Sequence, residues 1–118
     1  MGRESVETGK HGEDLAVQYL RGKGYMILER NYHSQQGEID IIAKDGEFLV
    51  FVEVKNYSVR SFGSPLGAIR RSKRESIIHA ARTYLYKNNI RNINCRFDVI
   101  VINNMKNFEL VKGAFNVG

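Results

Sequence analysis

Residues 37–55 constrain the fold most, because they combine two apolar runs with a turn signal between them. Residues 39–42 lead into an Asp-Gly step at 45–46, and residues 48–54 lead out of it. An Asp-Gly step between two β-rich runs is a strong signal for a β-hairpin. We therefore expect two adjoining antiparallel strands here.

Charged residues interrupt both runs of this hairpin, at positions where a strand built only for packing would carry apolar side chains. Asp40 lies in the first run, and Glu53 and Lys55 lie at the end of the second. Burying an unpaired charge costs on the order of several kcal/mol. These three residues are therefore the first candidates for a functional site.

The register of the hairpin predicts which of these charges meet. If the chain turns at the Asp-Gly step, Asp40 lies opposite Phe51, and Glu53 and Lys55 share the face of Phe51 because side chains alternate along a strand. Asp40 would then be a diagonal neighbour of Glu53, about 7 Å away at the backbone. A three-residue loop with a bulge would shift the register and remove this proximity.

Two carboxylates and an ammonium group are thus predicted to converge on one patch. Two like charges about 4 Å apart repel by about 4 kcal/mol at an intermediate dielectric, so one takes up a proton or a cation lies between them. All-oxygen ligands favour Mg²⁺ or Mn²⁺ over zinc. The alternative is a surface ion pair in which Lys55 neutralises Glu53, with Asp40 solvated at a strand end.

The spacing of Asp40 and Glu53-Val54-Lys55 resembles the PD-(D/E)XK nuclease signature. Further motifs follow in order along nearly the whole chain, namely His11 to Ala16, Asn31-Tyr32, Gly37 to Asp40, Phe51 to Lys55 and Arg96 to Val99. Together they resemble the bacterial YraN-like family. Its members are described as predicted endonucleases, related in fold to archaeal Holliday-junction resolvases.

This resemblance implies roles for individual residues. Asp40 and Glu53 would hold Mg²⁺ or Mn²⁺, together with the Val54 carbonyl. Lys55 would orient the attacking water or stabilise charge on the phosphorane. Glu13, read from its position alone, is a first-turn acid that complements the helix dipole. The resemblance makes Glu13 a candidate for a third acidic group at the metal.

A predicted helix over residues 66–87 carries a dense group of cations in its N-terminal half. These are Arg70, Arg71, Lys73 and Arg74. They are predicted to contact a nucleic-acid backbone, which gives affinity without sequence choice. The alternative is a solvated helix face, which is the usual fate of a charge run.

Composition supports a polyanion as partner. The 118 residues carry a formal net charge of +5, and this basic balance makes a polyanion the first partner to consider. The family resemblance implies that the polyanion is nucleic acid, with DNA the first choice. The single cysteine, Cys95, excludes an intramolecular disulfide. No signal peptide or membrane-spanning run is recognisable, so we expect a cytoplasmic protein. A homodimer would suit a two-stranded or branched substrate.

The predicted architecture is one α/β domain over residues 1–118. Helix 8–21, strand 25–32, the hairpin, helix 66–87 and strands 96–102 and 108–112 give the αβββαβ core of the restriction-endonuclease-like fold, with a mixed central sheet flanked by helices. Asp98 is expected to pair with Arg96 or a loop amide. The predicted function is metal-dependent phosphodiester hydrolysis of nucleic acid. The alternatives are a non-cleaving binding module that needs a partner protein and a metal-stabilised scaffold.

Overall fold

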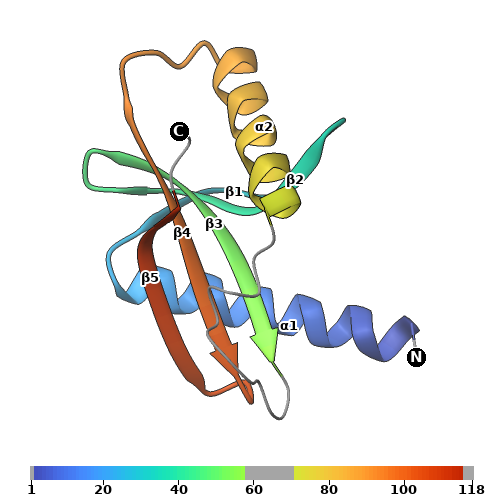
Figure 1. The fold of residues 1–118 in the computed structure, drawn as a ribbon. Helices are drawn as coiled ribbons and strands as arrows, with labels where there is room; N and C mark the ends of the chain where they lie inside the picture. The colour runs from blue at the N-terminus through green and yellow to red at the C-terminus, as the bar shows by residue number, and fades with distance from the viewer. Residues whose placement is uncertain (1, 58–70, 116–118) are drawn as a thin grey trace.

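The computed structural model describes the backbone of residues 2–57 and 71–115, and the side chains from residue 11 onward within those ranges. Two helices and five strands follow one another in the predicted order, and the expected α/β class is confirmed (Figure 1). The elements are α1 (Gly2–Gly22), β1 (Met26–Ser34), β2 (Gly37–Asp45), β3 (Phe48–Tyr57), α2 (Arg71–Lys87), β4 (Asn94–Asn103) and β5 (Asn107–Phe115). The first helix begins before the predicted Thr8, and both C-terminal strands are longer than expected.

The five strands form one mixed sheet in the order β1-β2-β3-β4-β5. Only β3 and β4 pair in parallel, and the other neighbours are antiparallel. A parallel pair needs a long connection between its strands, and α2 lies in the connection from β3 to β4. The predicted mixed sheet is confirmed.

The helices cover opposite faces of the sheet (Figure 1). The alternating pattern of β3 serves both faces: Val50 and Val52 belong to the apolar cluster of α1, while Leu49 and Phe51 belong to that of α2. Glu53 follows Phe51 by two residues and therefore lies on the α2 face. The α1 cluster contains Ala16, Val17 and Leu20, and the α2 cluster contains Ile77, Ala80, Ala81 and Tyr84.

The β2–β3 hairpin turns one residue later than the sequence suggests. Asp45 pairs with Phe48, so the two loop residues are Gly46 and Glu47, and Gly46 has a φ of 61°. A glycine at the first loop position suits a type II′ turn, whose twist matches that of the strands. The predicted register is thus wrong by two residues, but a shift by an even number leaves every side chain on its predicted face.

The β1–β2 hairpin twists sharply at one pair of residues. Asn31 stands opposite Asp40 in the register. Ile39 packs in the α2 cluster and Ile41 in the α1 cluster, although residues two apart in a regular strand share a face. Asn31 has a φ of 53°, a left-handed conformation that asparagine tolerates better than most residues. The residues beyond this pair therefore turn toward α2.

A buried ionic network ties the other end of the sheet together. Asp98 is fully buried and accepts hydrogen bonds from the Tyr25 hydroxyl at 2.7 Å, Arg96 Nε at 2.8 Å and the Gly113 amide at 3.0 Å. Arg96 also binds Asp45 at 2.7 Å. The predicted pairing of Asp98 with Arg96 is confirmed, and it links β4 to β5 and to the β2–β3 turn.

Candidate functional site

Asp40 and Glu53 come together where β2 and β3 separate. The last paired residues are Ile41 and Val52, so the next step along both strands places Asp40 opposite Glu53, whereas the predicted register made them diagonal neighbours. The Asp40 carboxylate also accepts a hydrogen bond from the Val54 amide at 2.8 Å. It thereby bridges the diverging strands and is held close to Glu53.

Burial and mutual repulsion perturb this carboxylate pair. Desolvation by burial, and then the charge of Glu53, together raise the pKa of Asp40 to about 7, against the opposing effect of the hydrogen bond from the Val54 amide. Glu53 itself is only 5% exposed. Near neutral pH the pair needs a proton or a cation to offset its charge. The alternative of a solvated Asp40 beside a surface ion pair of Lys55 and Glu53 therefore does not describe this site.

The two oxygens of Glu53 have different surroundings. Oε2 lies 3.3 Å from the Lys55 ammonium and 3.8 Å from the Lys73 ammonium. Oε1 is buried and has no hydrogen-bond partner among the described residues. A buried carboxylate oxygen without a partner is costly, so Oε1 is the atom of this site best suited to receive a ligand.

The cations predicted on the N-terminal half of α2 lie in different surroundings. Lys73 reaches the carboxylate site, while Arg71 forms an exposed ion pair with Glu75 at 3.2 Å. Arg74 is exposed on the same half of the helix, and Arg70 lies outside the described residues. Lys73 therefore belongs both to the predicted basic surface and to the acidic centre.

Glu13 lies beside β1 in a cluster of its own. Its Oε1 accepts hydrogen bonds from Arg30 Nε at 2.9 Å and from Asn31 Nδ2 at 3.0 Å.

Within residues 11–57 and 71–115, no group of three or more acidic, histidine or cysteine side chains is arranged to hold a metal ion. The structure brings together Asp40, Glu53 and Lys55, whereas Glu13 binds Arg30 and Asn31 instead. A role for Glu13 or for the Val54 carbonyl as a ligand stays a prediction.

The donor set nevertheless fits a hard divalent cation. Mg²⁺ in proteins commonly keeps several waters and is bound by only one or two carboxylates together with substrate phosphates. Asp40 and Glu53 supply two carboxylates, and Glu53 Oε1 is buried without a partner among the described residues. Nitrogen or sulfur ligands, which zinc prefers, do not accompany them in the described part of the chain.

Sequence reasoning does not predict two features of this site. It assigns Lys73 to a basic surface, and nothing in the spacing of Lys73 shows that it reaches Glu53 from another element. Asn31 was noted only as part of a motif, yet it stands opposite Asp40 with positive φ and binds Glu13. An asparagine inside a strand-like run is the one signal that could have drawn attention to it.

Neither helix in the described ranges is both long and apolar enough to cross a bilayer.

Comparison with known proteins identifies relatives that match most of the chain. It is 43% identical over 115 residues to a UPF0102 protein of Hahella chejuensis, covering 96% of this chain and 93% of the relative. It is 47% identical over 109 residues to one of Persephonella marina, covering 92% and 93%. It is 50% identical over 99 residues to one of Chlorobium chlorochromatii, covering 84% and 76%.

A family model described as "Uncharacterised protein family UPF0102" matches residues 12–102. That range includes both carboxylates of the site, Lys55, Lys73 and all of the Asp98 network except Gly113. The chain therefore belongs to the UPF0102 family.

Proposed function

We propose that this protein is a metal-dependent phosphodiester hydrolase of the PD-(D/E)XK type that acts on nucleic acid in the cytoplasm. One observation carries the proposal: Glu53 is buried directly across from Asp40, with one oxygen lacking a partner among the described residues and the other beside two ammonium groups. Natural proteins tolerate such a costly arrangement chiefly at functional sites.

Asp40 and Glu53 would hold Mg²⁺ or Mn²⁺. When bound there, the metal would polarise a phosphodiester and lower the pKa of a coordinated water. Lys55, whose ammonium lies 3.3 Å from Glu53 Oε2, would orient that water or stabilise the charge that develops on phosphorus. Lys73 brings a second positive charge from α2 to the same carboxylate. Preorganised charges of this kind stabilise a transition state most when water is excluded.

The basic face of α2 would hold the substrate. Arg71, Lys73 and Arg74 lie on the first turns of α2, where Lys73 reaches the carboxylates, and Arg70 precedes them in the sequence. Contacts to phosphates give affinity that falls as salt rises, without reading base sequence. DNA, including branched or structured DNA, is the proposed substrate, and a homodimer would let two such sites act on two strands.

The test is cleavage of labelled branched, flapped, linear and single-stranded DNA with Mg²⁺ or Mn²⁺. Four proteins are compared: wild type, Asp40→Asn, Lys55→Gln and the control Lys106→Gln, whose side chain is exposed in the β4–β5 turn. We expect metal-dependent cutting by wild type and control, with a loss of roughly a hundred- to a thousand-fold in each site variant. Cutting that persists in both site variants would rule out this site.

A second candidate function is a non-cleaving nucleic-acid-binding module completed by a partner protein. The observation that favours it is that the described residues bring only two acidic side chains together. Salt-dependent DNA binding by wild type, without cutting of any of the four substrates, would support this alternative over the nuclease.

A further inference from the structure

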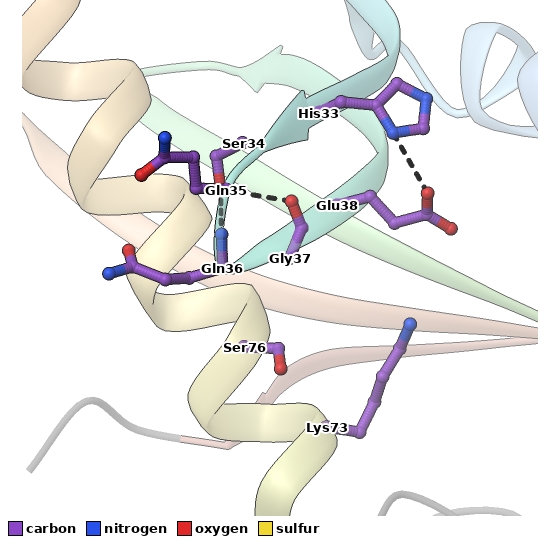
Figure 2. A pocket seen from close by; sticks show the side chains of 8 residues that line it. All are labelled: His33, Ser34, Gln35, Gln36, Gly37, Glu38, Lys73 and Ser76. Atoms are coloured by element: carbon purple, nitrogen blue, oxygen red, sulfur yellow. Dashed lines mark hydrogen bonds and ion pairs between the residues drawn. The ribbon is translucent and has the colours of Figure 1, made fainter.

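A polar hollow of about 450 Å³ lies beside the carboxylate site, between the β1–β2 turn and α2 (Figure 2). Its lining includes His33, Glu38, Lys73 and Ser76. Lys73 is shared between the hollow and the acidic centre, because its ammonium also lies 3.8 Å from Glu53 Oε2. A ligand in the hollow would therefore be a close neighbour of whatever the two carboxylates bind.

The wall of the hollow is built to a fixed shape. The Ser34 hydroxyl donates to the Gly37 carbonyl at 3.0 Å and accepts from the Gln36 amide at 3.3 Å, which fixes the turn. Gly37 packs against the α2 backbone so closely that a Cβ on it would lie 2.6 Å from the Ser76 carbonyl oxygen. The turn and the helix thus form one continuous surface, which lowers the cost of ordering on binding.

The hollow carries charges of both signs, and this limits the kinds of ligand that it can bind. Figure 2 shows the Glu38 and Lys73 side chains reaching toward the same side of the hollow from β2 and α2. Glu38 Oε2 lies 3.1 Å from His33 Nδ1. A bare phosphate would be attracted by Lys73 and repelled by Glu38. A nucleoside with a phosphate presents an anion at one end and N–H or O–H donors at the other, and carboxylates accept hydrogen bonds from such donors.

We infer that this hollow is a subsite for the nucleotide next to the bond that is cut, with its phosphate at Lys73 and its base or sugar donors at Glu38. The inference rests on the proposed function and names the part of the substrate that one surface holds. The Ser76 hydroxyl supplies a further polar group that can both donate and accept. The subsite would set the register of the nucleic-acid strand relative to Asp40 and Glu53.

The test is an amide NMR titration of the metal-free, full-length protein with deoxynucleoside 5′-monophosphates and, separately, with inorganic phosphate. We expect nucleotides to shift the amide signals of Gly37, Glu38 and Ser76, and inorganic phosphate to bind about tenfold more weakly. Glu38→Gln should weaken nucleotide binding about tenfold, the equivalent of one hydrogen bond to a charged group. Ser76→Ala should weaken it less.

Glu47→Gln is the matched control, because Glu47 is an exposed glutamate at the opposite end of β2. Shifts that map outside the hollow, or equal affinities for wild type and Glu38→Gln, would overturn the subsite. DNA cleavage assays on the same proteins separate this result from the proposed function. Cutting without nucleotide-induced shifts at the hollow would disprove only the subsite. Nucleotide binding in the hollow without cutting would disprove the nuclease and leave the hollow as a nucleotide-binding site.

Discussion

At the scale of single residues, the acidic centre depends on the mutual repulsion of two carboxylates. Replacing Glu53 with glutamine removes the charge of Glu53 but leaves the Asp40 carboxylate buried. We therefore expect Glu53→Gln to lower the pKa of Asp40 from about 7, but not to its ordinary value because desolvation remains. A carboxyl ¹³C NMR titration of metal-free protein measures this. Glu47→Gln should leave that pKa unchanged, and an unchanged pKa in Glu53→Gln would mean that the two groups do not interact.

Asn31 carries both backbone strain and a hydrogen bond to Glu13. Alanine at this position must adopt a φ of 53°, which costs about 1 to 2 kcal/mol, and it also loses the amide that binds Glu13. Glycine loses the same amide without the strain. We expect Asn31→Ala to unfold at lower urea concentration than Asn31→Gly. Equal midpoints would show that the conformation of Asn31 is not strained.

The residue scale also shows what a sequence pattern can predict about a site. Alternation along β3 placed Glu53 and Lys55 on the same face as Phe51, and the structure confirms that Asp40 meets Glu53 there. The arrival of Lys73 from α2 could not be predicted, because no local periodicity relates a helix position to a strand position in another element. The catalytic roles of these residues stay a proposal.

At the scale of secondary-structure elements, the β1–β2 turn is held against α2 by a backbone contact. Gly37→Ala would place a methyl group 2.6 Å from the Ser76 carbonyl oxygen, and neither backbone can yield as a flexible side chain can. We expect a loss of about 1 to 3 kcal/mol in the free energy of unfolding. The matched control is Gly22→Ala, where a Cβ would meet nothing within 4 Å. Equal unfolding curves for the two variants would mean that the turn is not fixed against α2.

The elements themselves were predicted more accurately than their register. Apolar runs and turn residues identified both helices and all the strands in order. The hairpin loop was misplaced by one residue because Asp-Gly fits a type I′ turn, whereas Gly-Glu fits a type II′ turn with glycine first. The twist at Asn31 and Asp40 was not foreseen either, since strict alternation assumes a regular strand. Both errors arise where local turn chemistry and tertiary packing decide the backbone.

At the scale of the whole molecule, the Asp98 network links Tyr25, which lies between α1 and β1, to strands β2, β4 and β5. The stability that it gives depends on pH in the alkaline range. Burial, and then the hydrogen bond to the Asp98 carboxylate, raise the pKa of Tyr25 well above 10. The unfolded chain therefore loses this phenolic proton at lower pH than the folded protein does. The resulting stability is fully present below pH 10 and declines as pH rises above it.

Tyr25→Phe removes that titration together with the hydrogen bond to Asp98. The variant should be less stable than wild type at pH 8, because one donor to a buried carboxylate is lost. Between pH 10 and 11.5 the gap should narrow, since only wild type loses stability through Tyr25, at up to about 1.4 kcal/mol per pH unit. Urea unfolding at a series of pH values measures both trends. A gap that stays constant with pH would mean that Tyr25 ionises equally in the folded and unfolded chain, and that the network does not hold its proton.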